Sequence, residues 1–128
     1  NPHLIPEIEK QLRSGVRTIK LGNLTPKRDF IHTYDMAEAI KRLLKTDSLG
    51  YDTFNLGSGI EYSVYEIVEG FERQLYEKIV IEVDQTRVRK VEREHLVADV
   101  SKLKSVTGWK PEWSIDDGVR NLIDSWNL

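Results

Sequence analysis

Apolar positions along the chain follow spacings that are typical of helices in some segments and of strands in others. Apolar residues recur at helical spacing within residues 3–14, which predicts an amphipathic helix that ends at Gly15. Alternating apolar and polar residues from Val16 to Leu21 then predict a short strand with one exposed face. A second short strand is predicted from Arg28 to His32.

The next segment predicts a helix followed by a buried strand. Asp35 is expected to cap a helix that runs to about Lys45, and its apolar stripe consists of Met36, Ala39, Ile40, Leu43 and Leu44. Tyr51 to Leu56 is predicted to form a buried strand, which ends in the turn Gly57-Ser-Gly59. This turn hints at a dinucleotide-binding loop, but Tyr62 stands where the third glycine belongs, so a plain turn between strand and helix is favoured.

Capping signals mark the helices in the second half of the chain. Ser63 and Glu66 form a capping box for a helix that reaches Leu75, and a strand is predicted from Ile79 to Val83. Residues 84–97 are charged and irregular, with a short strand near Leu96-Val97.

The C-terminal part predicts two more helices. Asp99 or Ser101 is expected to cap a short helix through Val106, which Gly108 ends. Trp109 is expected to cover the core, and Ser114 with Asp117 forms a second capping box for the last helix. Helices and strands mix throughout, which predicts an α/β fold, or α+β for the chain in isolation, with several helices and short strands.

Composition narrows the function classes. The 128 residues contain 39% hydrophobic and 31% charged residues with a net charge of -2, which gives no reason to expect a nucleic-acid or membrane surface. Cysteine is absent, so no disulfide framework or thiolate metal site is expected, and a cytoplasmic location is the simplest interpretation. The three histidines show no metal-ligand spacing, so no metal site is predicted.

One arginine and one group of four cations are candidates for binding an anion. Arg28 stands where a polar turn meets a strand, and a planar guanidinium there suits a phosphate or a carboxylate. The irregular segment 84–99 carries further cations, which form either a solvated surface or a phosphate clamp: Arg87, Arg89, Lys90 and Arg93.

Three motifs together resemble a known enzyme family. They are Gly22-Asn-Leu ahead of Lys27-Arg-Asp-Phe, Arg89-Lys-Val-Glu92, and the tail from Asp99 to Pro111. They resemble the extended short-chain dehydrogenases/reductases that act as NAD-dependent epimerases or dehydratases of sugar nucleotides, and most of all the GDP-mannose 4,6-dehydratases. The second motif departs from the family's Arg-Pro-Thr-Glu because it lacks the proline.

The resemblance implies roles for particular residues. Arg28 and Arg89 would neutralise the diphosphate of a nucleotide sugar, with a GDP-sugar favoured, and Glu92 would accept from a ribose hydroxyl. Asn23 would line the base or ribose pocket, and Leu4 with its helix would close one wall. No catalytic, cofactor-binding or metal-binding residue is assigned. The family reaction moves a hydride from C4 of the nucleotide-linked hexose to a nicotinamide, after which water is eliminated or the keto sugar is reduced again.

Two family motifs are absent from the sequence. No glycine-rich dinucleotide loop is present, and no tyrosine is followed by lysine at the fourth position. Residues 1–128 are therefore expected to be the substrate-binding C-terminal portion of a Rossmann-type enzyme, including the last strand–helix elements of the NAD-binding core at about 35–57.

The expected partners follow from that hypothesis. NAD or NADP would bind the full-length enzyme but not this chain alone, which is expected to be inactive without the N-terminal Rossmann half. The family also allows a homodimer. The alternative hypothesis is a non-catalytic nucleotide-sugar binding or interaction module with the same fold.

Overall fold

The computed structural model describes residues 4–46, 53–89 and 94–126, and the chain divides into two compact units. Unit 1 comprises Asn1–Pro26, Ser63–Glu94 and Ile115–Leu128. Unit 2 comprises Lys27–Tyr62 and His95–Ser114. Each unit is described by itself.

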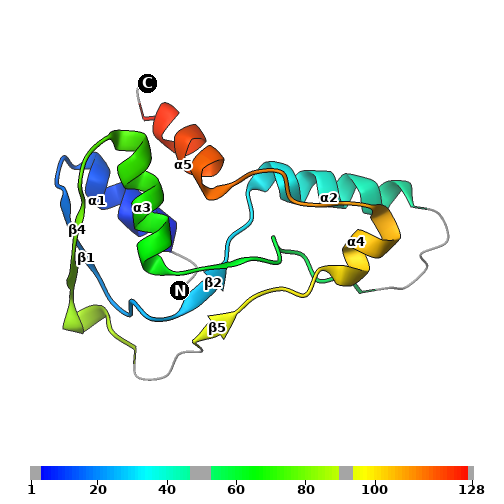
Figure 1. Cartoon of the computed structure of the whole chain (residues 1–128), viewed down its shortest axis with the longest axis horizontal. Helices are drawn as coiled ribbons and strands as arrows, with labels where there is room; N and C mark the ends of the chain where they lie inside the picture. The colour runs from blue at the N-terminus through cyan, green and yellow to red at the C-terminus, as the bar shows by residue number, and fades with distance from the viewer. Residues whose placement is uncertain (1–3, 47–52, 90–93, 127–128) are drawn as a thin grey trace. The chain divides into compact units, whose positions relative to one another are not determined.

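The described part of unit 1 consists of a pair of parallel strands with helices to one side of it (Figure 1). Its elements are α1 (Leu4–Arg13), β1 (Thr18–Leu21), α3 (Val64–Leu75), β4 (Val80–Val83), the 3-10 turn η1 (Gln85–Arg87) and α5 (Ile115–Asp124). Strands β1 and β4 pair in parallel from Thr18 opposite Val80 to Leu21 opposite Val83. The predictions for α1, β1, α3 and β4 are confirmed. The predicted last helix is present, but it ends at Asp124 and does not run to the C-terminus.

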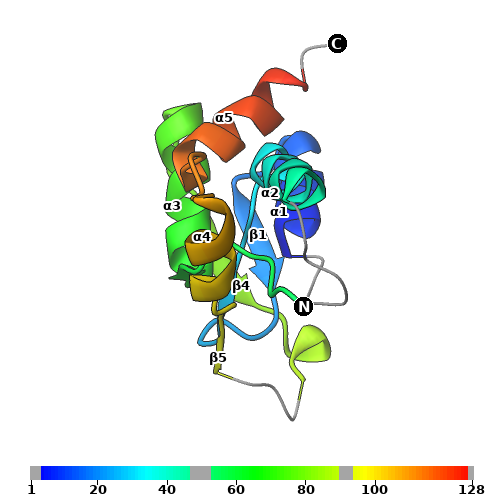
Figure 2. The ribbon, with the colours of Figure 1, turned by 90° about the vertical axis from the view of Figure 1, so that its right-hand side faces the viewer.

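The core of unit 1 follows the sequence pattern closely. Ile19 and Leu21 of β1 are buried while the residues between them are exposed, as the alternation predicted. Helix α5 lies against α3 in both views of the ribbon (Figures 1 and 2). Gly70 permits this contact, because a Cβ atom there would lie 3.0 Å from the Ile115 side chain. The other buried apolar residues of this core are Ile8, Leu12, Val64, Ile67, Val68, Phe71, Ile79 and Val119.

Helix α3 begins with the predicted capping box. The Ser63 hydroxyl accepts from the Glu66 N–H at 3.1 Å, and the Glu66 carboxylate accepts from the Ser63 N–H at 3.0 Å. Both amides would otherwise lack a partner at the start of a helix, so the prediction from Ser63 and Glu66 is confirmed.

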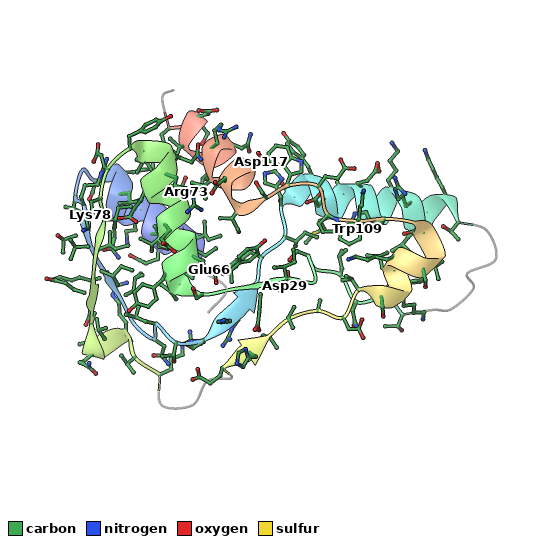
Figure 3. The ribbon with its side chains drawn as sticks, viewed as in Figure 1. Asp29, Glu66, Arg73, Lys78, Trp109 and Asp117 are labelled. Atoms are coloured by element: carbon green, nitrogen blue, oxygen red, sulfur yellow. The ribbon has the colours of Figure 1, made fainter. Side chains whose placement is uncertain are left out.

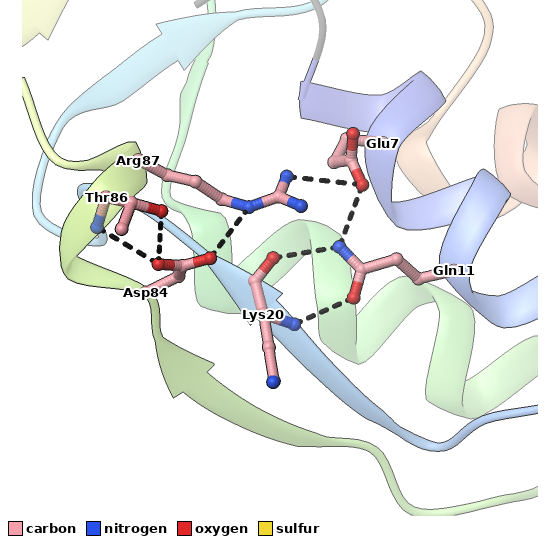
Figure 4. A network of polar contacts seen from close by, with 6 residues as sticks. All are labelled: Glu7, Gln11, Lys20, Asp84, Thr86 and Arg87. Atoms are coloured by element: carbon pink, nitrogen blue, oxygen red, sulfur yellow. Dashed lines mark hydrogen bonds and ion pairs between the residues drawn. The ribbon is translucent and has the colours of Figure 1, made fainter.

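A polar network holds the turn that follows β4 (Figure 4). Asp84 accepts from the backbone N–H of Thr86 at 3.0 Å and from its hydroxyl at 2.6 Å. Arg87 reaches back to Asp84 at 3.2 Å and across to Glu7 of α1 at 3.3 Å. Hydrogen bonds from Thr86 lower the pKa of Asp84, and a hydrogen bond from Gln11 lowers that of Glu7. The turn is therefore tied to α1 by groups that are charged at neutral pH.

Gln11 joins α1 to β1 in the same network. Its side-chain amide donates to the Lys20 carbonyl and accepts from the Lys20 N–H, both at 2.8 Å (Figure 4). A side-chain amide thus takes the place that a neighbouring strand would occupy.

Unit 2 contains a three-stranded sheet centred on β2 (Lys27–Asp29). Strand β3 (Glu61–Tyr62) pairs with it antiparallel, and β5 (His95–Leu96) pairs with it in parallel. Helices α2 (Thr33–Lys45) and α4 (Ser101–Thr107) complete the described elements of this unit. The short strand predicted near Leu96 is confirmed, although it lies one residue earlier.

Trp109 forms the centre of the unit 2 core. It is 1% exposed and packs with Ala39, Val100 and Leu103 (Figure 3). Its indole N–H donates to the Asp35 carbonyl at 3.0 Å. Gly108 ends α4 with a φ of 70°, so the expected helix end and the packing role of Trp109 are both confirmed.

Asp35 does not cap α2, which corrects the prediction for this residue. His32 is the N-cap, and its Nδ1 accepts from the Tyr34 N–H at 3.1 Å. Asp35 lies within the first turn, is 4% exposed, and accepts from the N–H groups of Glu112 and Trp113, both at 3.0 Å. It faces inward because it lies one helical turn before the buried Ala39.

The predicted strand from Tyr51 to Leu56 is also wrong in its described part. Residues 53–56 form no strand, and residues 51 and 52 lie outside the described residues. Phe54 and Leu56 pack against the unit 2 core, whereas Thr53 and Asn55 are exposed, so this segment is buried on one side only. None of the described strands pairs with it. Strand β2 ends at Asp29 rather than His32, because the chain leaves the sheet to reach the N-cap of α2.

Helix α2 has a second apolar face. Met36, Ile40 and Leu44 of the predicted stripe are exposed by 36%, 46% and 82%, whereas Ala39 is fully buried. Only one side of the predicted stripe therefore packs on the described core. In the parts of the chain that the structure covers, no helix is both long and apolar enough to cross a bilayer.

We predict that Asp35→Ala lowers the free energy of unfolding by about 1.5–3 kcal/mol, the usual value for a hydrogen bond to a charged group. Two backbone N–H groups, of Glu112 and Trp113, lose their acceptor. Denaturant unfolding measures the change, and Asp124→Ala, at an exposed position of α5, is the matched control. Equal stability of the two variants would contradict the prediction.

A second prediction concerns acid sensitivity of the turn after β4. The lowered pKa of Asp84, ordinarily 3.8, means that its carboxylate stabilises the fold above that value and that this stabilisation is lost as the pH falls through the lowered pKa. Thr86→Val removes the hydroxyl but keeps the backbone N–H, so the pKa of Asp84 should rise. A carbon-detected NMR titration measures it. Asp99, whose pKa Ser101 lowers, is the internal control, and an unmoved Asp84 would refute the assignment.

Candidate functional site

A pocket of about 300 Å³ opens in unit 2 beside β2 and β5. Arg28 and Asp29 contribute its charged groups. The remaining lining is apolar or small: Ile31, Leu56, Gly57, Leu96, Val97 and Ala98. A pocket of this size with apolar walls and few polar groups is typical of a small-molecule site, at the lower end of the size range.

Asp29 holds the chain segments around this pocket together. Its Oδ1 accepts from the N–H and the hydroxyl of Ser58 at 2.8 and 2.6 Å. Its Oδ2 accepts from the N–H groups of Gly59 and Ala98 at 2.9 and 3.2 Å. Asp29 is not among the site residues predicted from the sequence. The sequence feature that could have indicated this role is the run Gly57-Ser-Gly59, because backbone N–H groups in such a turn can bind a carboxylate.

The glycines near the pocket permit close approach within the chain. A Cβ atom on Gly57 would lie 2.7 Å from the Ala98 Cβ and 2.8 Å from the Asp29 Oδ2. Gly59 has a φ of +78°, a conformation that favours glycine. Contacts within the chain therefore account for the glycine at both positions.

Arg28 is half-buried on β2 and borders the pocket. Its Nη1 donates to the Lys27 carbonyl at 2.8 Å. The neighbouring Asp29 fixes the pocket wall, so the guanidinium stands at a site of defined shape.

Asn23 and Arg89 come together in unit 1, although 66 residues separate them. The Asn23 side-chain N–H donates to the Arg89 carbonyl at 3.2 Å, and its Oδ1 accepts from the Arg89 N–H at 2.9 Å. Both residues are predicted site residues. The side chain of Asn23 contacts the protein backbone.

The cations of the segment after β4 differ in their surroundings. Arg87 pairs with Glu7 and Asp84 and so supports the fold. Arg89 is exposed, and its guanidinium makes no hydrogen bond or ion pair within the described residues. Lys90, Glu92 and Arg93 lie outside the described residues.

The predicted site residues are divided between the two units. Leu4 is the half-buried first residue of α1 in unit 1, together with Asn23 and Arg89, whereas Arg28 belongs to unit 2. The convergence of Arg28 and Arg89 on one ligand stays a prediction. Across residues 4–46, 53–89 and 94–126, no cluster of side chains is suited to a metal ion.

Comparison with known proteins identifies the family. Residues 2–122 match the family model of GDP-mannose 4,6 dehydratase. A GDP-6-deoxy-D-mannose reductase from Pseudomonas aeruginosa is 29% identical over 118 residues, covering 91% of this chain and 38% of the relative. UDP-glucose 4-epimerase 2 from Oryza sativa subsp. japonica is 34% identical over 107 residues, covering 80% of this chain and 25% of the relative.

Solved structures share the fold. A UDP-glucose-4-epimerase from Stenotrophomonas maltophila, with bound NAD and formylated UDP-arabinopyranose, superposes with a TM-score of 0.83 at 26% identity, covering 96% of this chain and 39% of the other. The structure of RMD from Pseudomonas aeruginosa complexed with NADPH gives a TM-score of 0.82 at 24% identity, covering 96% and 41%. The chain thus spans about two fifths or less of each of these four proteins. It belongs to the GDP-mannose 4,6 dehydratase family, within the extended short-chain dehydrogenases/reductases that act on nucleotide sugars.

Proposed function

We propose that this chain is the nucleotide-sugar binding part of an NAD(P)-dependent sugar-nucleotide dehydratase, epimerase or reductase. The observation that carries the proposal is the pocket of unit 2, where Arg28 borders an apolar hollow whose wall is fixed by Asp29. A guanidinium on a defined wall suits a diphosphate. The family match supports the substrate class.

Arg89 supplies a second cation in this proposal. Its guanidinium is exposed, while its backbone is held by Asn23. Together with Arg28 it would neutralise the diphosphate and fix the sugar for reaction, and such orientation lowers a barrier without chemical participation. The names of the matched family and of the Pseudomonas aeruginosa reductase both refer to a GDP-linked sugar. We therefore favour GDP as the nucleotide.

We do not assign a dinucleotide loop to Gly57 and Gly59. Gly57 and Gly59 pack against Asp29, Ala98 and Val100. The space left by their missing Cβ atoms is therefore occupied by residues of the chain itself. The sequence also lacks a Tyr-x-x-x-Lys pair. In our proposal the cofactor and the acid/base group belong to another part of the enzyme, and this chain binds and orients the substrate.

We predict that Arg28→Ala and Arg89→Ala each weaken binding of GDP to the chain by about 1.5–3 kcal/mol, the range for hydrogen bonds to charged groups. Lysine at either position should restore only part of the loss, because an ammonium lacks the planar fork of a guanidinium. Isothermal titration calorimetry measures the affinities. Arg120→Ala is the matched control, since Arg120 is an exposed arginine of α5 that contacts the neutral Gln74.

Two results would argue against this clamp. Wild-type affinity in both arginine variants would remove the diphosphate contact from the proposal. A loss of equal size in Arg120→Ala would show that only the overall charge matters.

A separate prediction concerns turnover. With a GDP-sugar and oxidised NAD or NADP, the 128-residue chain alone should convert no sugar nucleotide above the protein-free background. The physical reason is that the chain carries no acid/base tyrosine–lysine pair and no fitting dinucleotide loop. Because dehydration and epimerisation return the hydride to the sugar, the measurement is chromatography of the sugar nucleotide, with absorbance of the reduced cofactor as a second readout. Conversion of the sugar by the chain alone would overturn the assignment of the cofactor and the acid/base group to another part of the enzyme. A second outcome concerns the alternative hypothesis. If the chain binds GDP but shows no turnover even with the proposed cofactor-binding part of the enzyme added, a non-catalytic binding module is favoured.

A further inference from the structure

The side-chain amide of Asn23 is paired with backbone groups, which changes the role expected for it. Its N–H donates to the Arg89 carbonyl at 3.2 Å and its oxygen accepts from the Arg89 N–H at 2.9 Å. Two residues of an antiparallel strand pair exchange the same two bonds. Asn23 therefore acts toward Arg89 as a neighbouring strand would.

Gly22 brings the two segments close enough for this pairing. A Cβ atom at Gly22 would lie only 2.4 Å from the backbone oxygen of Arg87, and this neighbour cannot swing away as a side chain end could. The parallel pairing of β1 with β4 ends at Leu21 and Val83, and the Asp84 N–H then donates to the Leu21 carbonyl at 2.8 Å. Gly22 and Asn23 thus continue the contact beyond the strands.

The two arginines of this segment have different environments. The guanidinium of Arg87 is held by Glu7 and Asp84. That of Arg89 is exposed and has no partner in the part of the chain that the structure describes, although its backbone N–H and carbonyl are both bonded to Asn23. The backbone is fixed while the charged group is left available.

We propose that Asn23 is a positioning residue that fixes the backbone of Arg89 and so presents its guanidinium to the diphosphate of the substrate. This inference rests on the proposed function. Holding a binding group in place before the ligand arrives reduces the ordering that binding requires. Asn23 contributes to affinity through Arg89, not through contact with the base or ribose.

The first test is a double-mutant cycle with GDP as the probe. Asn23→Ala should weaken GDP binding about threefold to tenfold, since two neutral hydrogen bonds are lost. In an Arg89→Ala background, Asn23→Ala should change GDP affinity no further. Asn121→Ala, an exposed asparagine of α5, is the matched control and should bind GDP like the wild type.

The second test reads the backbone without a ligand. Amide exchange at the Arg89 N–H should be slow in the wild type, faster in Asn23→Asp, which keeps an acceptor but places a carboxylate against the Arg89 carbonyl, and fastest in Asn23→Ala. Thermal melting of each variant shows whether the whole chain is destabilised. Asn23→Asp serves as the test variant if Asn23→Ala does not fold.

The outcomes separate the two hypotheses. If Asn23→Ala weakens GDP binding equally with and without Arg89, Asn23 is a direct ligand, and the positioning role is overturned while the proposed function stands. Unchanged exchange at Arg89 in both variants also overturns the positioning role. Failure of the wild-type chain to bind GDP would overturn the proposed function, and this inference with it.

Discussion

The carboxylate of Asp29 connects three segments that are far apart in sequence. It accepts from Ser58 and Gly59, about thirty residues ahead, and from Ala98, 69 residues ahead. A partly buried carboxylate is costly unless it is satisfied, and here each oxygen accepts two hydrogen bonds. Asp29 thus joins β2 to the turn at Ser58–Gly59 and to Ala98, two residues after β5, and Gly57 approaches it closely.

Side chains that take the place of backbone recur in unit 1. Gln11 pairs with both backbone groups of Lys20, and Asn23 does the same with Arg89. Both extend the hydrogen bonding of a sheet that has only β1 and β4 among its described strands. Short strands leave backbone groups unpaired at their edges and ends, and an amide side chain can satisfy a donor and an acceptor together. Residues 84–89 are therefore held in place by polar side chains.

Local signals in the sequence predicted most of the helices. They did not predict the hydrogen bonds between residues that are far apart in the chain. The capping box at Ser63 and the glycine at Gly108 depend on neighbours within four residues, so their geometry can be read directly. Asp35 has the sequence features of a helix N-cap. Only its position one helical turn before Ala39 indicated that its side chain is buried. Arg28 could be recognised as a candidate from its chemistry, but the bonds of Asp29 and Asn23 depend on partners that no local pattern specifies.

The way in which the two units share the chain affects how the molecule can fold. The backbone passes from one unit to the other after Pro26, Tyr62, Glu94 and Ser114, so neither unit is a continuous segment. The parallel pairing of β1 with β4 cannot form until the intervening residues, which include most of unit 2, have been brought into a closed loop. Closing a long loop costs conformational entropy before the contacts that reward it are made. Assembly of the two cores is therefore kinetically linked, and no single cut in the backbone would release either one intact.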